Sequence, residues 1–185
     1  MDYQTYWEEM FKKGEELNSL IISYWNDYSN TGTWQFWTVV ALFVIPLVIL
    51  YFTVDRKRIF ELFFFGYTVH LLWTYTDMVI ERYGYFVHTY FLSPFFPFAS
   101  NMNAAALPVA FLLLYQYCTN RSRNFHLYTL ILSAAFAFGF TSIEEGLGLL
   151  EFRKGMNYFY VFIIDVVIAY IAFWFTRIII KLKER

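Results

Sequence analysis

Three long stretches of the chain carry no charged side chain. No Asp, Glu, Lys or Arg occurs in residues 28–54, 83–120 or 124–143. Runs of about 20 apolar residues match the thickness of the hydrocarbon core of a bilayer. Charged residues make up 16% of the 185 residues and aromatic residues 24%, whereas a soluble domain carries about 25% charge. A soluble fold would have too little polar surface to cover so aromatic a core, so the sequence predicts a multispan membrane protein.

The apolar segments predict an all-α, polytopic membrane helix bundle. We expect a leader helix in residues 1–30 and one domain, residues 31–185, with five transmembrane helices. No internal repeat and no long linker divides this domain. The five spans are expected at about residues 34–54, 59–80, 98–118, 125–143 and 158–180.

The leader has the pattern of an amphipathic helix. Tyr3, Tyr6, Trp7, Met10 and Phe11 fall on one helical face, and most of the charged residues lie off it. Such a helix can lie in the headgroup plane of a membrane. It can equally pack as a lid over the outer ends of the spans, and the two interpretations are compatible. The acidic leader lacks the basic start of a secretory signal peptide.

The lysines and arginines predict the orientation of the spans. Nine of the fourteen fall on one side of a five-span arrangement, and positively charged loops stay in the cytoplasm. The amino terminus is therefore expected outside and the carboxyl terminus in the cytoplasm. The nine residues are Arg56, Lys57, Arg58, Arg121, Arg123, Arg177, Lys181, Lys183 and Arg185.

A polar stripe runs along the second expected span. At 100° per residue, His70, Thr74, Asp77 and Glu81 fall within about 60° of one another. The helical rise places His70 near the middle of the membrane and Asp77 about 10 Å further out. Residues of this kind inside a membrane face the bundle interior and need a partner.

Other spans supply groups that can meet this stripe. Asp165 lies about two turns into the last span, on a face of small residues that favours close helix packing. Glu144 and Glu145 end the fourth span about 100° apart, so one of them faces inward. Alignment with Ser133 and Ala137 slightly favours Glu144. Further amide groups could come from Asn101, Asn103 and Asn157.

No lysine or arginine within the spans lies where it could neutralise these acids. We therefore predict an outward-opening acidic pocket with aromatic walls and with His70 at its floor. The simpler interpretation is that the polar groups only fasten the helices together by hydrogen bonds. The aromatic loop of residues 83–98 fits either a belt at the membrane interface, which we favour, or a cap over a cavity.

The pocket leads to several hypotheses about function. We favour binding of a cation, or of a lipophilic ligand with a cationic head, because carboxylates and aromatic faces both attract cations. One alternative is a membrane-embedded, isomerase-like acid/base enzyme acting on a lipid, with His70, Asp77 and Glu144 as catalytic groups. Others are a proton or cation carrier and a structural or accessory subunit of an envelope complex. Overall the sequence leans against an enzyme.

The sequence also limits the partners. The chain is expected to lie in the lipid bilayer and to bind a lipid or an amine as ligand. The sequence does not decide whether it forms homo-oligomers or hetero-oligomers. A net charge of −1 gives no support for nucleic-acid binding. The three histidines have no convincing spacing for a metal site, and a mixed zinc site of His70, Asp77 and Glu144 is conceivable but unspecific. We therefore expect no metal, and no cofactor fingerprint is present in the sequence. The single cysteine, Cys118, excludes an internal disulfide.

The chain resembles an uncharacterised family of small five-span membrane proteins from endospore-forming bacteria. The resemblance covers roughly residues 35–180 and rests on Asp77, Glu144 or Glu145, the step Gly155-Met156-Asn157, and Asp165 where the family usually has asparagine. It implies a plasma-membrane or spore-inner-membrane location. It implies no activity.

A weaker resemblance is to the emopamil-binding, sterol-isomerase-like superfamily. It rests on His70 in the second span, on the run from Ala104 to Pro108 and on Glu144 or Glu145. The chain departs from these enzymes at Thr74, where they have glutamate, and at Asp165, where they have asparagine. The resemblance implies a site for an amine-bearing lipophile more strongly than it implies isomerase chemistry.

Overall fold

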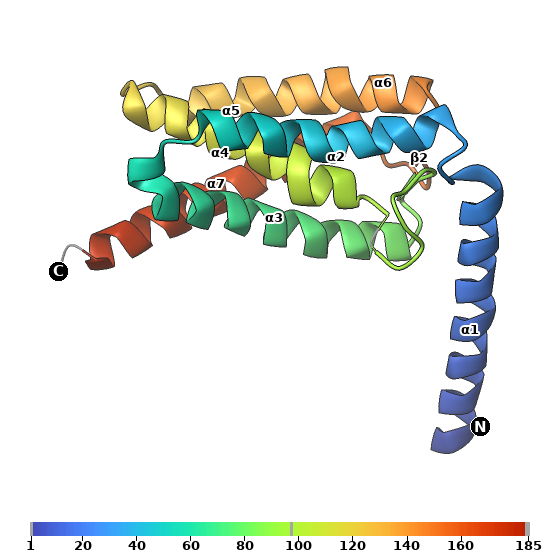
Figure 1. Cartoon of the computed structure of the whole chain (residues 1–185). Helices are drawn as coiled ribbons and strands as arrows, with labels where there is room; N and C mark the ends of the chain where they lie inside the picture. Colours follow the sequence, from blue (N-terminus) through green and yellow to red (C-terminus); the bar gives the residue numbers. More distant parts are fainter. Residues whose placement is uncertain (1, 97, 184–185) are drawn as a thin grey trace.

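The computed structural model describes residues 2–96 and 98–183, which are mostly helical (Figure 1). Outside the described residues lie Met1, Pro97, Glu184 and Arg185. Arg185 is one of the nine basic residues that predict the orientation, and its prediction lies outside the described residues. The elements in order are α1 (Tyr3–Tyr28), α2 (Trp34–Thr53), η1 (Arg56–Arg58), α3 (Ile59–Arg82), β1 (Phe86–His88), η2 (Met102–Ala106), α4 (Leu107–Asn120), α5 (Phe125–Ala134), η3 (Ala135–Phe140), α6 (Thr141–Gly146), β2 (Leu150–Phe152) and α7 (Tyr158–Lys183).

The all-α fold class is confirmed, and a helix lies at each of the five expected spans. Four helices of the described chain are long and apolar enough to cross a membrane: Trp34–Thr53, Met102–Asn120, Phe125–Gly146 and Tyr158–Leu182. α3 is not one of them, because polar side chains such as His70 and Asp77 make it less apolar. A crossing by α3, and therefore the count of five spans, stays a prediction.

The helices run side by side and give the bundle two distinct ends (Figure 1). α3 packs most extensively against α4 and α7, and α5 contacts both α4 and α7. We call the end with β1 and β2 the strand end. The opposite end, with η1, the turn between α4 and α5 and the last turns of α7, is the arginine end. Apolar side chains such as Val48 on α2 and Trp174 on α7 are exposed on the outside of the bundle, as suits contact with lipid.

Two helices contain wide π-helical turns. η2 precedes α4 without a break, and η3 joins α5 to α6. In η3 the carbonyl of Phe136 accepts hydrogen bonds from the backbone amide of Thr141 and, at 3.0 Å, from the Thr141 hydroxyl. Turns of this type occur frequently at functional sites, because they re-aim the side chains that follow. Both of these turns border the same cavity, described below.

The leader forms one helix, α1, which leaves the bundle at the strand end at a steep angle (Figure 1). Asp2 caps it by accepting a hydrogen bond from the Thr5 amide at 2.8 Å. No residue of α1 is buried. Just beyond its last turn, the buried Ser29 hydroxyl donates to the Phe91 carbonyl at 3.1 Å. The helix is therefore present as expected, and its contact with a membrane surface stays a prediction.

A two-stranded antiparallel ladder closes the strand end, which the helical pattern did not predict. β1 pairs with β2 in the register Phe86 to Phe152 and His88 to Leu150. The ladder joins the loop after α3 to the loop after α6. It therefore places loop residues directly beside the helix ends.

Candidate functional site

A small cavity of about 30 Å³ lies inside the strand end of the bundle. Four titratable side chains line it, and we call this space the acidic chamber: Asp77 on α3, His88 on β1, Glu144 on α6 and Asp165 on α7. A space of this size holds one or two water molecules or one metal ion. The other lining residues are Trp73, Phe86, Met102, Asn103, Leu107, Phe136, Thr141 and Val161.

Asp77 is held by the wide turn that begins α4. Its side chain is only 1% exposed. Its Oδ2 accepts a hydrogen bond from the Asn103 amide nitrogen at 2.9 Å. Asn103 belongs to η2, so the π-helical turn brings this amide to the carboxyl group. Asn103 therefore supplies an amide group to the acidic residues, as predicted.

Asp165 is the least satisfied group of the chamber. It is fully buried, and its Oδ1 accepts a hydrogen bond from the Trp73 indole nitrogen at 3.0 Å. Its Oδ2 has no hydrogen-bond partner among the described residues. An unpaired buried polar atom costs about 1–3 kcal/mol, and more when it is charged. Asp165 thus places an acceptor without a donor beside the cavity.

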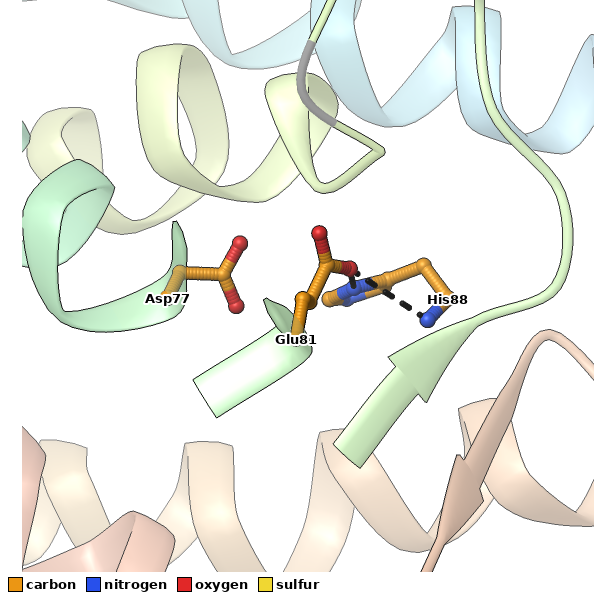
Figure 2. Close-up of side chains that lie close together, drawn as sticks. All are labelled: Asp77, Glu81 and His88. Atoms are coloured by element: carbon orange, nitrogen blue, oxygen red, sulfur yellow. Dashed lines mark hydrogen bonds and ion pairs between the residues drawn. The ribbon is translucent and has the colours of Figure 1, made fainter. Parts of the chain in front are cut away.

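His88 and Glu81 form a close pair at the chamber (Figure 2). Nδ1 of His88 lies 2.9 Å from Oε1 of Glu81, and His88 is 5% exposed. Burial lowers the pKa of this imidazole, but the hydrogen bond to Glu81 and the charges of Asp77, Glu81 and Glu144 raise it to about 9. The surroundings of His88 therefore favour a positive charge at this place.

Asp77, Glu81 and His88 also have the geometry of a metal site (Figure 2). One ligand atom from each of the three lies within 4.8 Å of the others. Mixed imidazole and carboxylate ligands suit zinc and other divalent transition metals. Three protein ligands leave coordination positions open for water or for a further oxygen.

No lysine or arginine is among the described residues that line the chamber. Glu144 is 4% exposed, so three carboxyl groups are buried around one small cavity. Buried charges of one sign need a counter-charge, a proton or a metal. The chamber can accommodate a positive charge, and among the described lining residues only His88 can supply one.

The structure separates the predicted site residues into two groups. It brings Asp77, Glu144 and Asp165 to the chamber, and Glu81 joins them through His88. The choice between Glu144 and Glu145 is settled, because Glu144 is buried, while Glu145 is exposed and accepts a hydrogen bond from the Tyr158 hydroxyl. Asn157 is also exposed, and its Oδ1 caps the start of α7 by accepting from the Phe159 amide at 3.0 Å.

His70 is the main correction. It does not line the chamber, and its Nδ1 donates to the backbone carbonyl of Asn103 at 2.7 Å. Thr74 lies beside it, with Oγ1 3.4 Å from the same Nδ1. His70 instead borders a separate cavity of about 170 Å³ between α2, α3 and α4, with mainly apolar walls. The zinc site and the catalytic group proposed from His70, Asp77 and Glu144 are therefore not assembled.

His88 is the residue that the sequence analysis missed. The aromatic loop was expected mainly as a belt at the interface, yet Phe86 and His88 line the chamber, as the alternative of a cap requires. Helical periodicity gives no information on a residue in a loop. The available signal was one histidine seven residues after Glu81, in a loop too apolar to be exposed.

We compared the chain with protein-family models, with curated proteins and with solved structures, and none of them matches it. The two resemblances described above therefore stay predictions, and the site is interpreted from its own geometry.

Proposed function

We propose that this chain is a polytopic membrane protein that binds a divalent transition-metal cation in the acidic chamber. The observation that carries the proposal is that Asp77, Glu144, Asp165 and His88 surround one cavity of about 30 Å³, and that the part of its lining that the structure describes has no lysine or arginine. Asp77, Glu81 and His88 provide the ligand atoms.

The cavity volume selects among the ligands expected from the sequence. A metal ion fits a space of about 30 Å³, whereas the head of an amine-bearing lipophile would require the walls to move apart. The unpaired Oδ2 of Asp165 favours the same choice, because a bound cation, or water in its shell, supplies the missing partner. A cation carrier would use this same chamber, and an enzyme would need a catalytic group in place of His70.

The orientation is part of the proposal. The strand end is proposed to face outside and the arginine end the cytoplasm, because most of the lysines and arginines lie at the latter. The chamber then takes its cation from the outer side, and α1 lies along the outer surface. Its steep angle to the bundle and its lack of buried residues support this placement (Figure 1).

The test is a titration of the purified full-length protein with Zn²⁺, after chelator treatment, by calorimetry. The wild type should bind about one ion per chain, and Asp77→Asn should weaken binding about 100-fold or more, since it removes a charged ligand. Asp27→Asn is the matched control, because Asp27 is exposed on α1. It should leave the affinity within about twofold. A wild type that binds no Zn²⁺, or equal losses in both variants, would refute the proposed site.

A further inference from the structure

The arginine end contains a second cavity, much larger than the acidic chamber. Its volume is about 590 Å³, which is within the range of sites for small organic ligands. It is bordered by the start of α3, the turn between α4 and α5, and the last turns of α7. Its charged or strongly polar lining includes Arg58, Glu61, Arg123, His126 and Arg177.

One arginine of this cavity is already neutralised. Arg58 binds both carboxylate oxygens of Glu61, at 3.1 and 2.6 Å. Glu61 also accepts a hydrogen bond from the Tyr115 hydroxyl at 2.6 Å. Glu61 is the only acid among the described residues that line the cavity, and its oxygens are occupied.

The other two arginines carry free positive charge into the cavity. Neither guanidinium has a hydrogen bond or an ion pair with a described residue. Arg177 lies over the Phe173 ring, at 5.5 Å, and is near enough to Glu61 to attract its carboxylate. Arg123 follows Ser122, whose φ of 51° places the chain in a left-handed turn. The lining therefore has a net charge of about +2 before any contribution from His126.

The backbone and the apolar walls add to this arrangement. Asn124 caps α5 by accepting a hydrogen bond from the Leu127 amide at 3.2 Å, and Asn124, Phe125 and His126 line the cavity. The amino-terminal end of α5, with its partial positive charge, therefore faces the same space. Phe125, Phe173 and Ile180 provide apolar surface beside the arginines. A ligand suited to this wall has an anionic group and an apolar part.

We propose that the arginine-end cavity binds the phosphate group of an anionic phospholipid. Arginine forks match phosphate oxygens geometrically, and basic recesses between membrane helices on the cytoplasmic side bind anionic headgroups. The cavity lies at the ends of α4, α5 and α7, which belong to segments apolar enough to cross a membrane. The arginines would therefore lie at the depth in the membrane at which lipid headgroups are found. The inference is independent of cation binding in the chamber.

The test uses the full-length protein in a neutral detergent and measures melting temperature and retained lipid by native mass spectrometry. Phosphatidylglycerol is the probe, phosphatidylcholine the neutral comparison and inorganic phosphate the free anion. Phosphatidylglycerol should stabilise the wild type and remain bound, and phosphatidylcholine should do neither. Arg123→Gln with Arg177→Gln should weaken phosphatidylglycerol binding by about tenfold or more, since two charge-assisted contacts are lost.

The matched control is Arg56→Gln with Arg121→Gln. These two arginines lie at the same end but do not line the cavity, so the control removes equal charge. It should change binding by less than about threefold. Equal losses in both double variants would overturn the proposal, because binding would then depend on overall charge. Full competition by inorganic phosphate would identify the free anion as ligand and would also overturn it. Arg123→Gln alone, at an exposed turn residue, provides a folded variant in which a several-fold loss is expected.

Discussion

The two ends of the bundle differ in the sign and in the burial of their charged side chains. At the strand end, three carboxyl groups are buried around a cavity of about 30 Å³. At the arginine end, Arg123 and Arg177 are exposed at the edge of a cavity of about 590 Å³. Burying an unneutralised charge costs several kcal/mol, whereas an exposed arginine costs almost nothing. The buried acids therefore require a stronger explanation, and a bound cation supplies one.

The largest difference between the ends is expected in their response to pH. Protonated His88 cannot coordinate a metal, and its pKa of about 9 lies above the usual 6.5. Below pH 9 the cation must displace this proton, so Zn²⁺ affinity should rise with pH, by up to about tenfold per unit between pH 7 and 8. Asp77, Glu81 and Glu144 face the imidazole and are included in this balance.

Calorimetric titrations at pH 7 and 8 measure this effect. Phospholipid binding at the arginine end should change much less over the same range, because the arginines that supply most of its charge remain charged. Zn²⁺ affinity that does not change with pH would remove His88 from the ligand set, and parallel changes at both ends would abolish the distinction between them.

A smaller effect is expected when the unpaired acid is neutralised. Asp165→Asn keeps an acceptor for the Trp73 indole and removes the charge beside the unpaired Oδ2. The metal-free protein should become more stable, by about 1–3 kcal/mol, while Zn²⁺ binding weakens. Thermal unfolding in detergent with a chelator, followed by the Zn²⁺ titration, measures both. A loss of stability with unchanged affinity would mean that Asp165 only fastens the helices.

The smallest effect is expected from salt. Exposed charges are screened within about 10 Å at 0.1 M ionic strength, and buried groups are screened less. Raising NaCl from 0.1 to 0.5 M should weaken phosphatidylglycerol binding about threefold and leave Zn²⁺ affinity nearly unchanged. Native mass spectrometry after equilibration at each salt concentration, together with calorimetry for Zn²⁺, tests this contrast. A stronger salt effect at the chamber would show that the chamber is open to solvent.

The sequence predicted the helices well, because apolar periodicity is a local property. α2 and α7 begin at the expected residues, whereas the third helix begins at Met102 rather than near residue 98. There the wide turn η2 and the loop before it interrupt the pattern. The prediction of five membrane crossings depends on α3. Polar side chains of this helix lie in the interior of the bundle, and they lower the hydropathy of the helix.

The site was predicted in part, for a related reason. Helical geometry predicted that Asp165 and one of Glu144 and Glu145 could meet the stripe that contains Asp77, and Asp77, Glu144 and Asp165 do meet at one cavity. Helical geometry also placed His70 on the stripe of Asp77. It could not show that the Asn103 carbonyl would accept a hydrogen bond from the His70 imidazole. His88 reaches the chamber through strand pairing between two distant loops. Periodicity within one segment contains no information about such pairing.

The β1–β2 ladder has a consequence for the rate at which a cation exchanges. His88 is the last residue of β1, opposite Leu150, so a strand that lines the chamber also carries one of its ligands. Separating the two strands would move the imidazole away from the other ligands. Release would then follow local opening of the ladder, on a timescale of microseconds to seconds. The residence time of the ion would be set by six paired residues.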